Sequence, residues 1–147
     1  MSTELALVDT NVLVYAFDPE FQYGTASRRL VEGAQQEDAG LCVAPQVLAE
    51  FFSVVTRPGP SSRTPVEAID AITQLLGLPG VTLLPVPVSV VAIWTGLVRR
   101  HPVSGGDVFD VQLVATMLGN NVRRIYTYNR ADFERFEEIQ VLTPEPR

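Results

Sequence analysis

The chain has 147 residues, of which 46% are hydrophobic and 19% charged, and its formal net charge is −6. This length and balance predict one globular domain, residues 1–147, and exclude a disordered chain, while the acidic charge argues against a protein that coats nucleic acid. The single cysteine, Cys42, excludes a disulfide framework and a multi-cysteine zinc site, and a reducing, cytoplasmic compartment is expected.

Apolar runs of strand length alternate along the chain with segments of helical character. The first run, 5–8, predicts a strand buried on both faces, and a short apolar helix follows it to residue 16. The second helix is predicted to begin with Thr25 as its N-cap and to end before Gly40. Further strands are predicted at 41–43, 81–86, 124–127 and 139–142, further helices at 45–56, 64–76, 88–100 and 107–118, and a helical turn at 130–136.

Strands separated by helices pair in parallel through right-handed crossovers. The predicted fold is therefore α/β: a three-layer α/β/α domain around a central, mainly parallel sheet of about five strands. The segment 71–98 carries no charge and is long enough to span a bilayer. Glycines and prolines interrupt it, however, so we interpret it as a helix end, a buried strand and the start of another helix, not a membrane span.

Asp9 directly follows the first strand, at the carboxyl end where ligands of parallel sheets gather. It can also cap the helix that follows, a role compatible with binding a metal. Glu50 lies on a helix that is apolar almost all round, which predicts a largely buried helix. A buried glutamate needs a partner, and either a metal or an ion pair with an arginine such as Arg57 would provide it.

Asp107 and Asp110 are three residues apart and so share one face of the helix that they begin. Asp107 is expected to be the N-cap at the lip of the site and Asp110 to be directed inward, where the helix dipole would keep it ionised. Asp132 follows the strand 124–127, and its simplest role is in the first turn of a helix capped by Asn129. What favours a common site is that all four acids, Asp9, Glu50, Asp110 and Asp132, are predicted at one rim of the sheet.

Crowded carboxylates repel one another unless a cation lies between them. Mg²⁺ is the expected ion, with Mn²⁺ as the alternative, because both bind carboxylate oxygens. The single histidine, His101, argues against a histidine-based zinc or iron centre and is expected at the surface. Such a metal site, with one ion or two, suits phosphodiester hydrolysis, and Glu50 or Asp132 could orient the attacking water.

Four segments of the chain resemble the PIN-domain ribonucleases, and the VapC toxins of bacterial toxin–antitoxin systems in particular. These segments are Asp9-Thr10-Asn11-Val12-Leu13, the Val-Leu-Ala-Glu-Phe run that contains Glu50, Phe109 to Ala115, and Thr127 to Phe133. They occur in the family's order and rough spacing, and the likeness covers nearly the whole chain.

The resemblance implies a Mg²⁺- or Mn²⁺-dependent endoribonuclease acting on RNA, with tRNA or rRNA as candidate substrates, inhibited by a cognate VapB-type antitoxin and homodimeric. It makes Asp9 and Asp110 the principal metal ligands and Glu50 the acid between them. Asp132 matches the acid before a phenylalanine, but many PIN domains have Asp where Asn129 stands, which leaves a second metal open. Asn11, Thr127, Asn129 and Asp107 are expected to support the site, although Asp107 is outside the shared pattern.

Two other functions are compatible with parts of the sequence. A haloacid-dehalogenase-like phosphatase also begins with an Asp after its first strand, but it would need a second Asp at Asn11 and a lysine, and all eleven basic residues here are arginines. A catalytically silent PIN-like module that binds RNA or protein is the other alternative. The presence of all four acids favours the enzyme.

Overall fold

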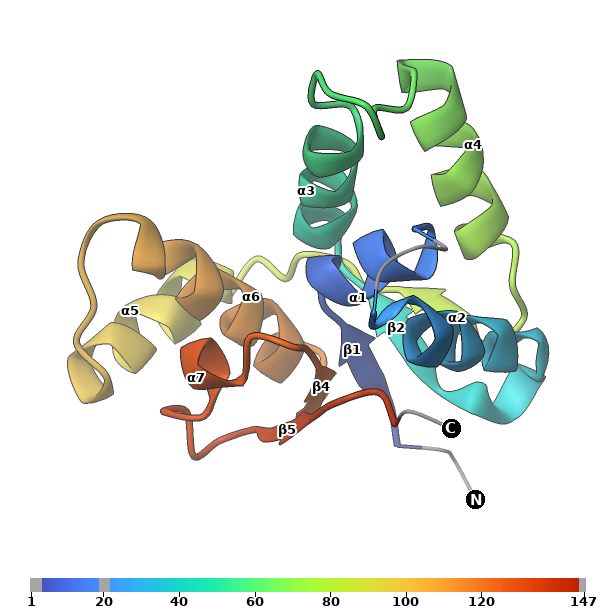
Figure 1. Cartoon of the computed structure of the whole chain (residues 1–147). Coiled ribbons are helices and arrows are strands. Elements are labelled where there is room, and N and C mark those ends of the chain that lie inside the picture. The colour runs from blue at the N-terminus through green and yellow to red at the C-terminus, as the bar shows by residue number, and fades with distance from the viewer. Residues whose placement is uncertain (1–3, 19–21, 146–147) are drawn as a thin grey trace.

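Five short parallel strands form the centre of the molecule in the computed structural model, which describes residues 4–18 and 22–145 (Figure 1). The strands are β1 (Ala6–Val8), β2 (Leu41–Val43), β3 (Val81–Leu83), β4 (Arg124–Tyr126) and β5 (Gln140–Leu142). Their order in the sheet is β3-β2-β1-β4-β5, and every neighbouring pair is parallel. The sheet confirms the predicted α/β class.

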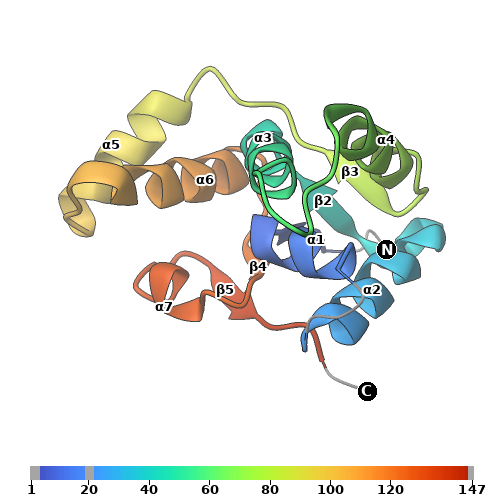
Figure 2. The same cartoon turned by 45° about the horizontal axis from the view of Figure 1, so that its top comes forward.

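Helices cover both faces of this sheet, as Figures 1 and 2 show. Right-handed crossovers explain their distribution. The chain steps from β1 to β2 to β3 in one direction, which places the first four helices on one face, and it then returns to β4 over the other face. The helices are α1 (Thr10–Ala16), α2 (Gly24–Glu32), α3 (Pro45–Val55), α4 (Pro65–Leu76), α5 (Val90–Arg100), α6 (Val108–Gly119) and α7 (Arg130–Phe133), with 3-10 turns η1 (Gly33–Gln35), η2 (Glu37–Ala39) and η3 (Gly105–Asp107).

The strand order creates a switch point between β1 and β4. From β1, one connection leads to β2 on one side of the sheet, while β4 lies on the other side and is reached much later in the chain. Helices leave the two strands towards opposite faces there, which opens a crevice at the carboxyl ends. Asp9 follows β1 and Thr127 follows β4, so the switch point lies beside both residues.

The hydrophobic core lies between the sheet and its two helix layers. All three residues of β1 are buried, as the apolar run predicted. The largest fully buried side chains are three phenylalanines, Phe51 on α3, Phe133 on α7 and Phe136. They pack within one cluster with the strands, so α3 and α7, which carry site residues, are anchored by apolar contacts.

Some predicted boundaries are wrong. Thr25 does not cap α2, which begins at Gly24 with Tyr23 in the N-cap position, and Gly40 ends η2 in a left-handed conformation with φ 71°. The strand predicted at 81–86 stops at Leu83, before Pro85 and Pro87, and it lies at the sheet edge, where it is largely exposed and not buried.

The uncharged segment 71–98 divides between the end of α4, β3 and most of α5. Within residues 4–18 and 22–145, no helix is both long and apolar enough to cross a membrane. His101, expected at the surface, is partly buried instead. Its Nε2 lies 3.1 Å from Oε1 of Glu138, and its ring contacts Phe136 edge-on with 5.2 Å between centroids.

Gly80 provides a test of the packing that holds β2 and β3 together. Its N–H donates to the carbonyl of Ala34 at 2.7 Å, and its carbonyl accepts from the N–H of Leu41 at 3.0 Å. An added Cβ would overlap the backbone carbonyl oxygen of Gln36. We expect Gly80→Ala to lower the free energy of unfolding by about 1–3 kcal/mol in urea titrations. Gly33→Ala is the matched control, since nothing lies within 4 Å of its Cβ, and equal losses for both would contradict this account.

Candidate metal centre

Asp9 is a buried carboxylate at the switch point, with an exposed fraction of 7%. Its backbone N–H donates to the carbonyl of Tyr126 at 3.0 Å, which extends the pairing of β1 with β4. Its Oδ1 accepts from the N–H of Thr10 at 2.8 Å, so the expected capping role is real. The same carboxylate also lines a cavity, and capping therefore does not compete with a role in the site.

Thr127 and Asn11 hold the second oxygen of Asp9. The fully buried hydroxyl of Thr127 donates to Oδ2 at 2.8 Å, and the Asn11 amide donates to the same oxygen at 3.3 Å. Asn11 also accepts from the N–H of Tyr128 at 3.1 Å, which joins α1 to the segment after β4. These bonds fix the orientation of Asp9 before any ligand binds.

Burial raises the pKa of Asp9 above its ordinary value. The hydrogen bonds from Thr127 and from the Thr10 N–H act in the opposite direction, and the negative charges of Glu50 and Asp132 raise the pKa further. The carboxylate is thus short of positive charge in its surroundings.

Glu50 is not on a largely buried helix, although the apolar sequence of α3 predicted one. Only Val47 and Phe51 of that helix are buried, and Glu50 itself is exposed. Its Oε2 accepts from the hydroxyl of Thr10 at 3.0 Å. In the part of the chain that the structure describes, Glu50 forms no ion pair with Arg57 or with any other arginine. The predicted ion pair is therefore wrong.

Gln46 is a residue of the site that was not predicted from the sequence. Its Nε2 donates to Oε1 of Glu50 at 3.2 Å and to the carbonyl of Phe109 at 2.9 Å, which links α3 to the beginning of α6. Its Oε1 is buried and has no hydrogen-bond partner. Its position one helical turn before Glu50 was the available signal, since residues four apart on a helix are neighbours.

Asp110 is partly buried and Asp107 is exposed, as their expected orientations required. Asp107 occupies the N-cap position of α6 but its side chain makes no capping bond. Burial and then the charges of Asp132 and Asp9 raise the pKa of Asp110 to about 6, with Arg135 opposing the shift and Glu50 adding to it. Burial and the neighbouring carboxylates therefore outweigh the helix dipole that was expected to favour the ionised form of Asp110.

Asp132 and Asn129 complete the acidic rim. Both are exposed, and the N–H of Asp132 donates to the backbone carbonyl of Asn129 at 3.1 Å. Asn129 occupies the N-cap position of α7, as predicted, but its side chain makes no capping bond. Asn129 and Asp132 both line the same cavity as Asp9.

This acid cavity has a volume of about 310 Å³. All four predicted acids line it, together with Asn11 and Asn129. Thr127, which donates to Asp9, and Asp107 are not part of the lining. The full lining is Asp9, Thr10, Asn11, Val14, Tyr15, Glu50, Val54, Asp110, Asn129, Asp132 and Phe133. None of these residues is basic. Four carboxylates in a lining without lysine or arginine make the cavity negative, and Arg135, which lies outside the lining, offsets this charge only in part at Asp110.

The acid cavity is not a finished metal cage. Among residues 4–18 and 22–145, no three carboxylate, histidine or cysteine side chains are arranged closely enough to hold an ion by themselves. Mg²⁺ commonly uses one or two protein carboxylates and keeps several waters, so it does not need such a cage. The side chains in the lining that can bind a metal all offer oxygen atoms. Neighbouring negative charges help to raise the pKa of Asp9 and of Asp110. Both features fit a hard divalent cation.

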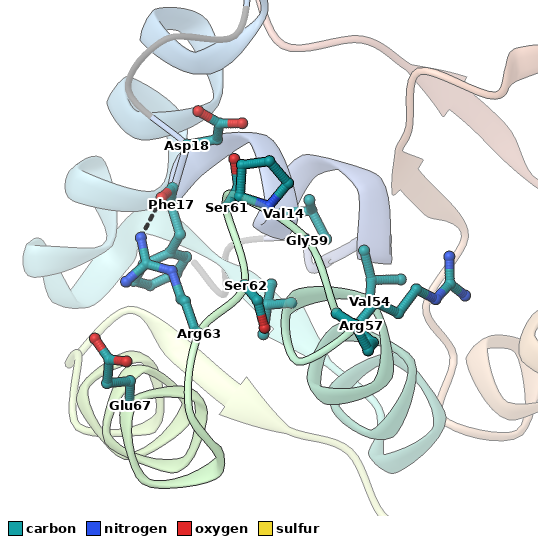
Figure 3. Close-up of a pocket in the computed structure, with 13 residues that line it drawn as sticks. Val14, Phe17, Asp18, Val54, Arg57, Gly59, Ser61, Ser62, Arg63 and Glu67 are labelled. Atoms are coloured by element: carbon teal, nitrogen blue, oxygen red, sulfur yellow. Dashed lines mark hydrogen bonds between the residues drawn. The ribbon is translucent and has the colours of Figure 1, made fainter.

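A larger cavity of about 550 Å³ adjoins the acid cavity and shares Val14 and Val54 with it. The loop after α3 forms one side of it, and Arg57 and Arg63 extend from this loop in opposite directions (Figure 3). Nη2 of Arg63 donates to the carbonyl of Phe17 at 2.5 Å. Arg57 and Arg63 therefore line this neighbouring cavity and not the acid cavity.

Residues 6–139 match the PIN-domain family. The chain belongs to that family. This PIN domain is also 31% identical over 137 residues to VapC ribonuclease Mb2897 of Mycobacterium bovis and to ribonuclease VapC43 of Mycobacterium tuberculosis, in alignments that cover 90% of this chain and 90% of each relative. These relatives make it a VapC-type PIN domain.

Solved structures show the same fold at much lower identity. VapBC2 from Rickettsia felis, bound to a DNA fragment from its promoter, superposes with a TM-score of 0.70 at 14% identity, covering 96% of this PIN domain and 99% of that chain. VapC20 from Mycobacterium tuberculosis, described as a Sarcin-Ricin loop cleaving toxin, gives 0.65 at 17% identity, covering 91% and 98%. The resemblance, the α/β/α fold and the ribonuclease class predicted from the sequence are confirmed, and the phosphatase alternative has no support.

The raised pKa of Asp110 makes the metal-free PIN domain less stable at neutral pH. The folded state binds this proton more tightly than the unfolded state, so stability falls as the pH rises from about 3.8 to about 6 and stays reduced above it. We expect Asp110→Asn to stabilise the EDTA-treated protein at pH 7 by about 1 kcal/mol, after allowance for solvent screening of this half-exposed group, and to have little effect at pH 3.5.

Urea unfolding at the two pH values measures this difference, with the exposed Asp70→Asn on α4 as the control. Adding Mg²⁺ or Mn²⁺ at pH 7 is expected to raise the free energy of unfolding of the native chain by more than it raises that of the Asp110→Asn variant. An Asp110→Asn variant that is less stable than the native chain in EDTA at pH 7 would refute the assignment.

Proposed function

We propose that this VapC-type PIN domain is a Mg²⁺-dependent endoribonuclease, the toxin component of a VapBC-type toxin–antitoxin system. One observation carries the proposal: Asp9, Glu50, Asp110 and Asp132, from four separate elements, line one cavity at the switch point of the sheet. Relatives that are VapC ribonucleases support the same activity.

Asp9 and Asp110 are the residues proposed to hold the cation, with Glu50 and Asp132 beside them. Mg²⁺ is the first choice and Mn²⁺ the second, because only oxygen donors line the acid cavity. When bound, such an ion polarises a phosphoryl oxygen and lowers the pKa of a bound water. Asn129, where many related domains have Asp, leaves a second ion an open part of the proposal.

The protein's own side chains orient the carboxylates and the attacking water. Thr127 and Asn11 hold Asp9 in one orientation, and Gln46 and Thr10 hold Glu50. The exposed carboxylates of Glu50 and Asp132 are the groups that can orient the attacking water and accept its proton. The negative cavity discourages binding of RNA phosphates until a cation is present, which would make activity strictly dependent on the metal.

A VapB-type antitoxin and a second copy of the chain are the proposed protein partners, and the cytoplasm, where RNA is available, the proposed compartment. Structures similar in fold include VapBC-1 from nontypeable Haemophilus influenzae and a toxin–antitoxin complex from Klebsiella pneumoniae. Exposed apolar side chains on α4 and α5, among them Val66, Ile69 and Val91, provide surface for such contacts.

The activity is tested with purified protein and total cellular RNA in Mg²⁺, Mn²⁺ or EDTA. We expect discrete cuts that need the metal, and a loss of more than about 100-fold in rate for Asp9→Asn and Asp110→Asn, because each removes a proposed ligand. Asp70→Asn, with an exposed acid on α4, is expected to cut at the native rate. Circular dichroism and urea unfolding show whether each variant is folded.

Two outcomes would count against the nuclease. Folded native protein that binds RNA but cuts none of it with any divalent ion would favour a silent binding module. Native-like cutting by Asp9→Asn and Asp110→Asn would show that the reaction takes place elsewhere.

A further inference from the structure

Three side chains along one face of α3 connect the acid cavity with the larger cavity that adjoins it. Glu50 lines the acid cavity, Val54 lines both cavities, and Arg57 lines the larger one. Residues four and seven apart lie on the same face of a helix. The N–H of Arg57 donates to the carbonyl of Val54 at 3.4 Å, so the helical turn continues past the end of α3 to this arginine. An acidic, an apolar and a basic side chain therefore follow one another along a single surface.

Arg57 is an exposed arginine without a carboxylate partner. Within residues 4–18 and 22–145, its guanidinium forms no ion pair and no hydrogen bond. Arg63, the other arginine that lines the larger cavity, is less exposed, donates to the carbonyl of Phe17 and interacts with the charge of Glu67. Glu67 lies on the side of Arg63, while Arg57 extends the opposite way (Figure 3). Of the two guanidinium groups, that of Arg57 is therefore the one available to a ligand.

Hydrogen bonds on both sides of Arg57 hold the backbone that carries it. The hydroxyl of Thr56 donates to the carbonyl of Phe52 at 2.7 Å. The N–H of Arg63 donates to the carbonyl of Val55 at 2.8 Å, which closes the loop back onto the end of α3. The Arg57 side chain thus extends from an anchored backbone, and less conformational freedom is lost when it binds a ligand.

The charge of the acid cavity explains why a basic contact is needed outside it. A metal ion in the cavity can neutralise the phosphate that is cut, but the neighbouring phosphates of the RNA remain close to four carboxylates. Seven residues separate Glu50 from Arg57, which is about 10 Å along a helix axis. Successive phosphates of one strand are about 3.4 Å or more apart along a duplex axis, so this distance corresponds to a few nucleotides. One RNA strand can therefore contact the metal and Arg57 at the same time.

We propose that Arg57 is a subsite for a backbone phosphate of the RNA, and that the substrate strand runs from the metal along α3, past Val54, into the larger cavity. A guanidinium is always charged in proteins and can bind two phosphate oxygens at once. Contacts to phosphates read no base, but they fix the register and orientation of the strand. Arg57 therefore sets the side of the cut on which the RNA is held. This inference rests on the proposed nuclease function and adds the path of the substrate to it.

The binding test titrates a short fluorescent single-stranded RNA with protein in Ca²⁺ at several salt concentrations, and the RNA is checked for integrity afterwards. Arg57→Gln is expected to bind roughly three- to tenfold more weakly at low salt. The plot of log affinity against log salt concentration is expected to become less steep by about 0.7, which is the loss of one phosphate contact on a single strand. Arg57→Lys keeps the charge and is expected to keep the slope. Arg99→Gln is the matched control, because it removes an exposed charge on α5 that lines neither cavity.

A second test locates the phosphate that Arg57 binds. In an RNA that the native protein cuts at one position, single linkages are replaced in turn by neutral methylphosphonates. We expect one linkage, on one side of the cut and a few nucleotides from it, whose replacement raises KM for the native protein with little change in kcat. The same replacement is expected to have no further effect on Arg57→Gln, because two changes that remove one contact are not additive.

Either of two results would overturn the subsite. One is an Arg57→Gln variant, folded by circular dichroism, that matches Arg99→Gln in affinity and in salt slope. The other is a set of neutral linkages that each affect the native protein and Arg57→Gln equally. The two proposals fail separately: RNA that is cut with either of these results removes only the subsite, whereas RNA that is bound with the expected salt slopes but never cut removes only the nuclease.

Discussion

The hydrogen bonds that hold the buried carboxylate of Asp9 between β1 and β4 are the constraint on which the site depends. A buried carboxylate is costly unless it is hydrogen-bonded or paired, and Asp9 is bonded to Thr127, Asn11 and the Thr10 N–H. Each donor belongs to the switch point, so the strand order of the sheet and the orientation of the acid are set together. The other acids are arranged around this fixed group.

The site combines a rigid centre with an open rim. Asp9 is fixed by three hydrogen bonds, while Glu50, Asp132 and Asn129 are exposed. The inner carboxylates have raised pKa values, and the rim has no arginine or lysine among the described residues that line it. Such an arrangement favours the binding of a cation together with its water molecules.

The sequence predicted the parts of this site that depend on local order. An acid that comes soon after a strand reaches the carboxyl edge of a parallel sheet whatever its partners are, which is why Asp9, directly after β1, and Asp132, in the short helix after β4, were found. Glu50 was found for an incorrect reason. Its helix is rich in apolar residues, but only Val47 and Phe51 are fully buried, and Glu50 lies on a face that is exposed to solvent.

What the sequence could not reveal depends on contacts between distant segments. The pKa of Asp110 is raised by burial and by charges from Asp9 and Asp132, and neither is visible in the helix that carries it. The link from Gln46 to Phe109 and the stacking of Tyr23 on Tyr128 likewise join residues far apart in the chain. The shorter β3 reflects a competition that pattern alone resolves poorly, since apolar residues continue past Leu83 while Pro85 and Pro87 stop the pairing.

The sequence separation of 118 between Asp9 and Thr127 has a consequence for a toxin during its own synthesis. Translation makes Asp9 first, and β4 and Thr127 follow only after all the elements from α1 to α6 have been made. Until then the nascent chain lacks β4, which pairs with β1, and the residues after β4 that line the acid cavity. A nascent toxin, or a product of translation interrupted before Thr127, therefore lacks this hydrogen bond and Asp132, and it cannot complete the acid cavity.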